Sequence, residues 1–287
     1  MISTPFEYRL AASVEEAVRL LGASPDAKLL AGGHSLLPLM KLGLAQPALL
    51  VDIGRIAALR GIRVDGEITI GALTTHQAIA DDATCQARLT ALSEAAASVG
   101  DVQVRGRGTI GGSLAHADPG SDEQACALAF GATMRVVGPK GDRAIAAADF
   151  FKGALETALG KGEVLVSARF PVPAGRTGSA YAKVAHPASG FALVGVAVVV
   201  TVAKDGTIER AAIGVTGAAD RPFRAAAAER ALAGTTGDAA AIAAAAAKAA
   251  DGAQLTTDLA ASAEFRTQLL VVHTRRALRR AVEAAKK

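Results

Sequence analysis

Two short segments with adjacent glycines constrain the fold of this chain more than any other feature. They are Ala31-Gly32-Gly33-His34-Ser35 and Thr109-Ile110-Gly111-Gly112-Ser113. In each, a strand pattern is expected to lead into the glycines, and a serine follows within two positions. Adjacent glycines permit positive φ and let backbone N–H groups converge on an anion, while serine adds a donor. One such segment is also typical of an ordinary turn, but the pair predicts two loops that hold the two phosphates of a pyrophosphate.

Other nucleotide-binding and hydrolytic motifs fit less well. Residues 106–111 match the Rossmann fingerprint formally, but Gly111 does not open a clear helix pattern and no βαβ unit surrounds it. The chain has no Gly-Lys-Ser/Thr, which excludes a P-loop by pattern. Ser113, His116 and Asp118 are the residue types of a hydrolytic triad, yet they lie too close in sequence to converge, and no Gly-x-Ser-x-Gly is present. Hydrogen bonding within a loop is the simpler interpretation.

Length and composition limit the class of protein. With 287 residues and 51% hydrophobic content, the chain can bury more than one core, so two or three subdomains are expected. The longest apolar run, Phe191–Val202, is shorter than the ~20 residues that span a membrane. The segment Met1–Glu7 lacks the features of an export signal, so we expect a cytoplasmic protein. The chain has no tryptophan and no interleaving of basic with aromatic residues, which argues against nucleic-acid binding.

The two cysteines, Cys85 and Cys126, lie far apart without a Cys-x-x-Cys motif or paired histidines. This predicts buried free thiols, with neither a disulfide nor a metal site. Two cysteines are also too few for an iron–sulfur cluster, which normally needs four ligands. Four arginines cluster near the C-terminus: Arg275, Arg276, Arg279 and Arg280. We interpret them as the solvated face of a last helix, with docking to another subunit as the alternative.

Local patterns predict a chain that mixes helices and strands. Ser13 and Glu16 form a capping-box pattern for a helix ending at Gly22, and Asp65-Gly66 is typical of a hairpin turn. The loop 171–179 is the strongest candidate for a boundary. Further helices are predicted at 36–44, 76–80, 89–99, 225–250 and 264–285, and strands at 28–31, 48–53, 62–64, 67–70, 132–137, 164–170, 191–202 and 208–215. Strands followed by helices in the last third favour an α+β class.

Three segments resemble a known family. They are Ala31–Pro38 (AGGHSLLP), Thr109–Pro119 (TIGGSLAHADP) and His186–Ala192 (HPASGFA). Together, in this order and spacing, they look like the FAD-binding medium subunit of molybdenum hydroxylases, closest to the carbon monoxide dehydrogenase type, and the resemblance covers essentially the whole chain. It implies the vanillyl-alcohol oxidase (PCMH-type) FAD-binding fold, with subdomains at residues 1–57 and 58–172, followed by a C-terminal α+β domain at 178–287.

The resemblance also implies a set of FAD-binding residues. The pyrophosphate would lie on the two glycine segments, Asp122 would hydrogen-bond the dinucleotide, and Leu165, Lys183 and Phe191 would lie near the isoalloxazine. The set is Ala31, Gly32, Gly33, His34, Ser35, Leu36, Thr109, Ile110, Gly111, Gly112, Ser113, Asp118, Asp122, Leu165, Lys183 and Phe191. The sequence departs from the commoner family pattern after Pro119, which leaves the roles of Asp118 and Asp122 open. Phenylalanine at 191 replaces a frequent tyrosine and removes its hydroxyl.

A function in electron transfer follows from the same resemblance. The chain's FAD would accept electrons from the [2Fe-2S] clusters of a small subunit, in a complex whose large subunit carries molybdopterin, and pass them to a quinone, NAD or another acceptor. The implied assembly is a dimer of heterotrimers, cytoplasmic or peripheral at the inner membrane through the complex. No acid–base residue of this chain is required for that role. One alternative is the same subunit in an aldehyde or N-heterocycle dehydrogenase; a more distant one is a non-catalytic interaction protein whose glycine segments are turns.

Overall fold

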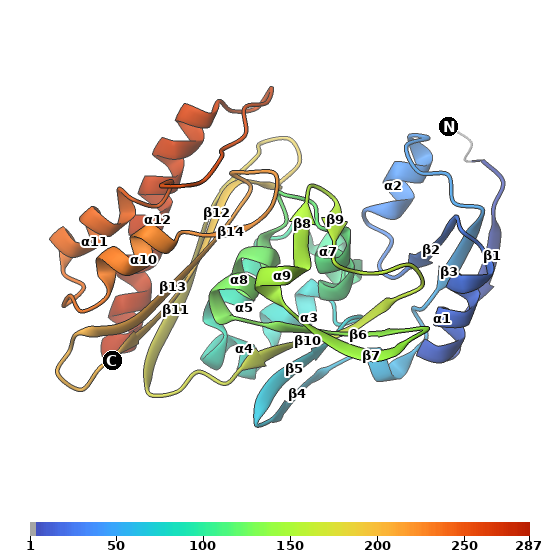
Figure 1. Cartoon of the computed structure of the whole chain (residues 1–287), viewed down its shortest axis with the longest axis horizontal. Helices are drawn as coiled ribbons and strands as arrows, with labels where there is room; N and C mark the ends of the chain where they lie inside the picture. The colour runs from blue at the N-terminus through green and yellow to red at the C-terminus, as the bar shows by residue number, and fades with distance from the viewer. Residues whose placement is uncertain (1–3) are drawn as a thin grey trace.

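The computed structural model describes residues 4–287, and its first unit is a small parallel sheet. Three strands pair in the order β1-β3-β2, and a helix follows each of the first two strands (Figure 1). Parallel neighbours need such crossover connections because a tight turn cannot join them. The elements are β1 (Glu7–Leu10), α1 (Val14–Ala23), β2 (Ala27–Leu30), α2 (Leu36–Lys41) and β3 (Leu49–Asp52).

The middle unit is a five-stranded antiparallel sheet, ordered β4-β5-β10-β6-β7, covered by helices. A short helix, η1 (Ala57–Leu59), connects it to the first unit. Its strands are β4 (Ile62–Asp65), β5 (Glu67–Gly71), β6 (Thr133–Gly138), β7 (Gly141–Ala146) and β10 (Val164–Pro171), with a separate pair β8 (Phe151–Gly153) and β9 (Glu156–Thr157). Its helices are α3 (His76–Asp81), α4 (Ala83–Arg88), α5 (Thr90–Ala97), α6 (Val102–Arg107), α7 (Ile110–His116), α8 (Asp122–Phe130) and α9 (Ala147–Phe150).

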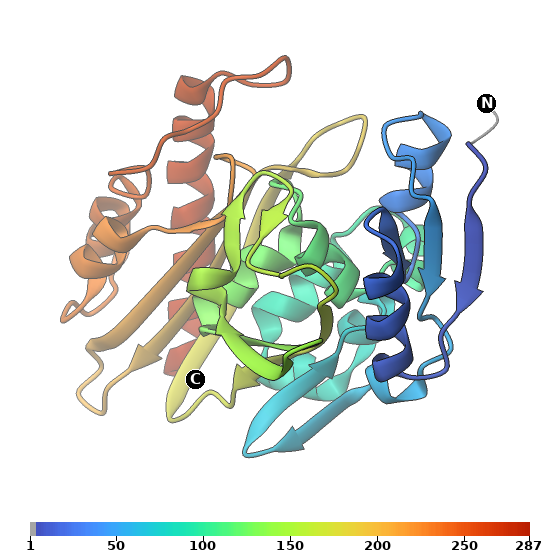
Figure 2. The same cartoon turned by 45° about the vertical axis from the view of Figure 1, so that its right-hand side comes forward.

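The C-terminal unit is a four-stranded antiparallel sheet between two layers of helix (Figures 1 and 2). It comprises β11 (Arg176–Ala185), β12 (Ala192–Val202), β13 (Ile208–Thr216), β14 (Phe223–Arg224), α10 (Ala226–Leu232), α11 (Ala239–Ala246) and α12 (Ala263–Lys286). Both layers pack closely: a Cβ on Gly178 would lie 2.2 Å from the Ala281 carbonyl oxygen of α12, and one on Gly214 would lie 2.0 Å from the Ala125 oxygen of α8. Because both faces of β12 are covered, its near-continuous run of valine is buried.

The α+β class and the FAD-binding fold with a C-terminal α+β domain are confirmed, and several boundaries differ from the predicted ones. Gly22 lies inside α1, which ends at Ala23. The predicted helix 225–250 is two helices, because Gly234 and Gly237 adopt positive φ between them. The Asp65-Gly66 turn joins β4 to β5 as predicted. None of the helices within residues 4–287 has the length and apolar character needed to cross a membrane.

The cysteine and arginine predictions can also be compared with the structure. Cys85 and Cys126 are both buried free thiols, as expected. The four C-terminal arginines lie on the exposed face of α12, as the solvated-face interpretation requires. Arg280 departs from that picture, because its guanidinium contacts Glu94 of α5 and donates to the Tyr181 carbonyl of β11. It therefore ties the last helix to the middle unit.

Candidate functional site

A cleft of about 960 Å³ opens between the first and middle units. This volume is near the upper end of the ~300–1,000 Å³ typical of ligand sites. Thirteen of the sixteen predicted binding residues line it, and only Ile110, Asp118 and Lys183 do not. The loop between β11 and β12 closes one side with Ser189–Phe191, so all three units contribute to the cleft. The structure thus brings together segments that lie far apart in the sequence.

The first glycine loop, residues 31–35, connects β2 to α2 and carries free backbone donors. Among the residues that the structure describes, no acceptor is found for the N–H groups of Gly32, Gly33, His34 and Ser35. The Ser35 side chain makes no capping hydrogen bond, and Gly33 adopts φ +80°, which favours glycine. Consecutive N–H groups at a helix start form a concave site for phosphate oxygens. This loop therefore fits a pyrophosphate.

The second glycine loop, residues 109–113, has a different structure from the predicted one. It follows α6 rather than a strand, and it opens α7 with Thr109 as the N-cap residue. The N–H groups of Ile110 and Gly111 donate to the Thr74 and Ala72 carbonyls at 3.1 and 2.9 Å. A Cβ on Gly111 would lie only 2.7 Å from the Ala72 Cα. The expectation that Gly111 opens no helix was wrong, because α7 begins at Ile110 with Thr109 as its cap. The close approach to Ala72 explains why residue 111 is a glycine.

The first loop contacts the end of α6 at Gly32. A Cβ there would lie 2.2 Å from the Arg107 carbonyl oxygen, which no adjustment of a flexible side chain could relieve. Gly32 is therefore required for the approach of two backbones. In the second loop, Gly112 donates from its N–H to Thr109 Oγ1 at a long 3.2 Å, and the Ser113 side chain lines the cleft. Gly112 and Ser113 therefore lie at the surface of the cleft.

Asp122 and Asp118, whose roles the sequence leaves open, occupy different environments. Asp122 opens α8, is 4% exposed and lines the cleft. Its Oδ1 accepts from the Tyr181 hydroxyl at 2.6 Å, and its Oδ2 accepts from Lys183 Nζ at 2.9 Å. Burial raises the pKa of Asp122, and the Lys183 charge opposes that shift. Asp118 instead accepts from the Gly120 N–H at 2.9 Å and shapes its own turn.

Lys183 lies behind Asp122 rather than on the cleft surface. Its Nζ also donates to the Ser98 carbonyl at 3.1 Å, and its side chain is only 8% exposed. Tyr181 and Lys183 therefore hold the Asp122 carboxylate in one orientation. Leu165 is 5% exposed on β10, whereas Phe191 is 44% exposed on the β11–β12 loop. These two residues supply apolar surface to the cleft.

A buried ion pair beside the second loop is a feature that the sequence did not reveal. His76 lines the cleft, and its Nδ1 lies 2.8 Å from Glu123 Oε1. Glu123 Oε2 is buried without a hydrogen-bond partner among residues 4–287. Burial alone lowers the pKa of His76, but the neighbouring Glu123 carboxylate outweighs it, and the net pKa is raised. The partners are 47 residues apart, so no local pattern links them.

The segment between β8 and β10 is a second feature that sequence reasoning missed. Leu155 and residues 159–163 line the cleft together with Leu44 and residues 45–47 of the first unit. No motif marks either stretch, because both contribute through their position and not through a chemical group. They add length to the cleft, as a dinucleotide requires.

Comparison with known proteins agrees with this geometry. Residues 4–173 match the family described as FAD binding domain in molybdopterin dehydrogenase, and residues 179–281 match the CO dehydrogenase flavoprotein C-terminal domain. The carbon monoxide dehydrogenase medium chain of Hydrogenophaga pseudoflava is 42% identical over 97% of each chain. A solved structure of carbon monoxide dehydrogenase from that organism has a TM-score of 0.95 at 44% identity over 99% of both chains. Quinoline 2-oxidoreductase from Pseudomonas putida 86 has a TM-score of 0.93 at 34% identity over 100% of both.

The chain therefore belongs to the FAD-binding medium subunits of molybdenum hydroxylases. Within that class it is of the carbon monoxide dehydrogenase type, and it is a subunit of an oxidoreductase. FAD is its cofactor. The free N–H groups of the first loop and the volume of the cleft fit that group.

Proposed function

We propose that this chain holds FAD in the cleft between its first two units and passes electrons from [2Fe-2S] clusters of a small partner subunit to an external acceptor. The observation that carries the proposal is the run of free backbone N–H groups from Gly32 to Ser35, at the rim of a cleft large enough for a dinucleotide. Bound FAD supplies both one-electron and two-electron chemistry, so this chain's own residues need only bind and orient it.

The residues divide this task by position. Gly32, Gly33, His34 and Ser35 donate backbone hydrogen bonds to the pyrophosphate, and Gly112 and Ser113 approach it from the second loop. The free N–H groups of the first loop support this assignment.

Asp122 accepts a hydrogen bond from the dinucleotide, because a carboxylate has room for more than the two bonds it already makes. Lys183 acts through Asp122, which it holds in place. Leu165 and Phe191 give an apolar surface for a ring, and the remaining predicted residues, Ala31, Leu36, Thr109, Ile110, Gly111 and Asp118, shape the loops.

The partners follow from what this chain cannot supply. Cys85 and Cys126 are buried in the middle unit and are fewer than the ligands of one iron–sulfur cluster. We assign the clusters to a small subunit and molybdopterin to a large subunit, in a dimer of heterotrimers that is cytoplasmic or peripheral at the inner membrane. The acceptor is a quinone, NAD or another carrier. The sheet boundaries support the division into residues 1–57, 58–172 and 178–287.

A second candidate function differs only in the substrate of the complex. The similarity to quinoline 2-oxidoreductase supports an N-heterocycle dehydrogenase as the second candidate, since a medium subunit of either enzyme would have this fold. Genomic neighbours that encode the large subunit would separate the two candidates.

A stopped-flow experiment on the purified complex tests the electron path. After mixing with substrate under anaerobic conditions, we expect absorbance of the clusters to bleach first and that of FAD to follow at a rate at least equal to turnover. Reduction of the clusters without reduction of FAD would contradict the proposal. The same experiment with carbon monoxide, an aldehyde and an N-heterocycle identifies the substrate.

A further inference from the structure

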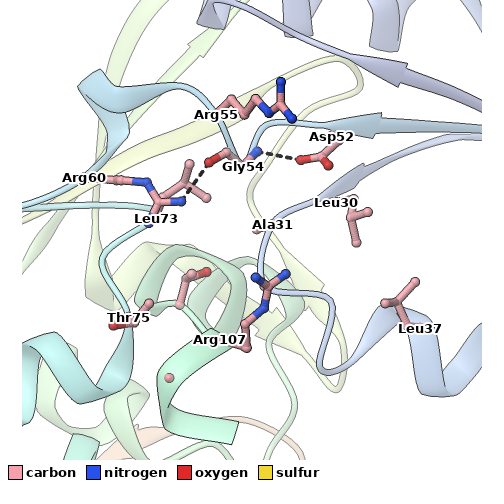
Figure 3. Close-up of a pocket in the computed structure, with 13 residues that line it drawn as sticks. Leu30, Ala31, Leu37, Asp52, Gly54, Arg55, Arg60, Leu73, Thr75 and Arg107 are labelled. Atoms are coloured by element: carbon pink, nitrogen blue, oxygen red, sulfur yellow. Dashed lines mark hydrogen bonds between the residues drawn. The ribbon is translucent and has the colours of Figure 1, made fainter. Parts of the chain in front are cut away.

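A second cavity, of about 260 Å³, lies where the first and middle units meet (Figure 3). It shares Ala31, Gly32, Leu73 and Thr109 with the FAD cleft, and its other lining residues are different. Three arginines line this cavity and do not line the FAD cleft: Arg55, Arg60 and Arg107. We call it the arginine pocket.

The arginine pocket carries an excess of positive charge. Its lining contains three arginines and one acid, Asp52, which gives a formal charge of +2. Each oxygen of Asp52 accepts a hydrogen bond from a group outside the three arginines: Oδ1 from the Gly54 N–H and Oδ2 from the Tyr8 hydroxyl, each at 2.6 Å. None of the three arginines forms an ion pair with any residue from 4 to 287. All three arginines are exposed to solvent, which screens their mutual repulsion, so an oxyanion would be held mainly by hydrogen bonds from their guanidinium N–H groups.

The donors of the pocket are partly fixed before any ligand binds. Arg60 Nη2 donates to the Gly54 carbonyl at 2.7 Å, which holds its guanidinium against the wall (Figure 3). In the same view Arg107 extends into the pocket from the opposite wall. Thr75 and Thr109 each accept a backbone N–H through Oγ1, from Ala78 and Gly112, so their hydroxyl protons remain available to donate.

From these observations we propose that the arginine pocket is a second ligand site, which binds a small tetrahedral oxyanion: inorganic phosphate or the phosphoryl group of a small ester. Guanidinium groups bind phosphate through paired N–H···O bonds. The volume is below the ~300 Å³ at which sites for larger organic ligands begin, which excludes a second dinucleotide.

Because of the pocket's position, a bound oxyanion should affect the binding of FAD. Asp52, Gly54 and Arg55 come from the first unit, whereas Arg60 and Arg107 follow it in the chain and border the middle unit. An oxyanion bound among them would hold together the two units between which the FAD cleft lies. Coupling between two ligands is reciprocal, so phosphate should slow FAD release and FAD should tighten phosphate binding. This consequence rests on the FAD assignment, whereas the binding of the oxyanion does not.

Isothermal titration of the FAD-loaded full chain with inorganic phosphate, in low-salt buffer free of other oxyanions, tests the site. FAD occupies the glycine loops, so phosphate cannot bind there instead. We expect one saturable site, and a double variant Arg55→Ala/Arg107→Ala should weaken it by at least about tenfold, since each lost charged hydrogen bond is worth about 1.5 kcal/mol or more. Arg63→Ala, an exposed arginine of β4 outside the pocket, is the matched control and should bind as the wild type does.

Two further measurements are needed. One identifies the source of the oxyanion, and the other separates loss of binding from a folding defect of the double variant. Glycerol 3-phosphate that binds more tightly than inorganic phosphate would identify a phosphate ester as the ligand. Arg107→Lys keeps the charge and should bind with an intermediate affinity if the charge matters. The proposal fails if the wild type shows no saturable binding, if the double variant binds equally well, or if malonate binds as tightly as phosphate. It also fails if the assembled complex loses the site, because the pocket would then be a subunit contact.

Discussion

The two glycine loops share a sequence pattern but have different structural roles. In the first loop, four successive N–H groups have no acceptor among the described residues, and the chain is open toward the cleft. In the second loop, the N–H groups of Ile110 and Gly111 are already bound to carbonyls of the middle unit. The first loop can therefore give most of its donors to a pyrophosphate, whereas the second mainly fixes the start of α7. Adjacent glycines indicate a close approach, but not whether a ligand or another backbone makes it.

Within each pair, one glycine serves packing and the other serves conformation or access. Gly32 and Gly111 lie against neighbouring backbone, at Arg107 and Ala72. Gly33 has positive φ, and a Cβ on Gly112 would approach only the Thr109 side chain, at 2.9 Å. Alanine substitutions at these four positions should therefore reduce stability and FAD binding to different extents.

The largest effect is expected for Gly32→Ala. Its Cβ would meet the Arg107 carbonyl, so the first loop must move away from the end of α6, and we expect a loss of about 3 kcal/mol or more in the free energy of unfolding together with loss of FAD. Denaturant titration and the FAD content of the purified variant measure both. The control is Gly22→Ala inside α1, where a Cβ would meet nothing within 4 Å and helix propensity should improve stability by about 1 kcal/mol. Equal behaviour of the two variants would show that the contact at Gly32 is unimportant.

Gly111→Ala and Gly112→Ala should differ although the residues are neighbours. Gly111→Ala places a methyl group against the Ala72 backbone and should cost about 2 kcal/mol of stability. Gly112→Ala meets a single threonine hydroxyl, which can rotate, and should cost less than about 1 kcal/mol. Thermal unfolding of both apoproteins measures the difference. A larger loss of stability for Gly112→Ala than for Gly111→Ala would contradict our assignment of packing to Gly111 and access to Gly112.

Gly33→Ala should separate FAD binding from stability. A non-glycine residue at φ +80° costs about 1–2 kcal/mol, and the loop can relax because its N–H groups have no acceptor among residues 4–287. The relaxed loop would no longer direct those donors at the pyrophosphate. We therefore expect FAD affinity to fall by at least about tenfold with little change in melting temperature. Unchanged FAD binding, measured by fluorescence titration, would count against the first loop as the main phosphate site.

The smallest effect is expected in the pH dependence of stability, which involves the His76–Glu123 pair beside the second loop. The pKa of His76 is raised in the folded chain by Glu123, so its contribution to stability is fully present below the unfolded pKa and is lost as pH rises through the folded pKa. The raised pKa of Asp122 acts in the same direction. His76→Gln should therefore flatten, without abolishing, the fall in unfolding free energy between slightly acidic and alkaline pH. An unchanged profile from denaturant titrations at several pH values would show that the His76–Glu123 pair is not responsible.

The sequence was sufficient where the signal was local. Ser13 caps α1 by accepting the Glu16 N–H at 3.2 Å, as the capping box predicts, although Glu16 reaches back to the Ala12 N–H instead of the Ser13 N–H. The Asp65-Gly66 hairpin is local as well, and three motifs were enough to indicate the family.

What could not be predicted depends on contacts between distant residues. Gly32 against Arg107, Gly111 against Ala72, and the His76–Glu123 pair join elements that meet only in the folded chain. Asp118 and Asp122 illustrate the same limit. The hydrogen bond from the Gly120 N–H to Asp118 is local and agrees with the loop predicted from the sequence. The contacts of Asp122 with Tyr181 and Lys183 join residues distant in the chain and could not be predicted.

The FAD content of the natively purified chain tests the central claim most directly. Acid-released cofactor would be identified by chromatography and compared with the protein concentration, for the wild type and for Gly33→Ala. The account predicts one FAD per wild-type chain and substoichiometric FAD in the variant, with recovery on adding excess FAD. A colourless wild-type chain that cannot be reconstituted with FAD would contradict it, and the glycine loops would then be turns of an interaction protein.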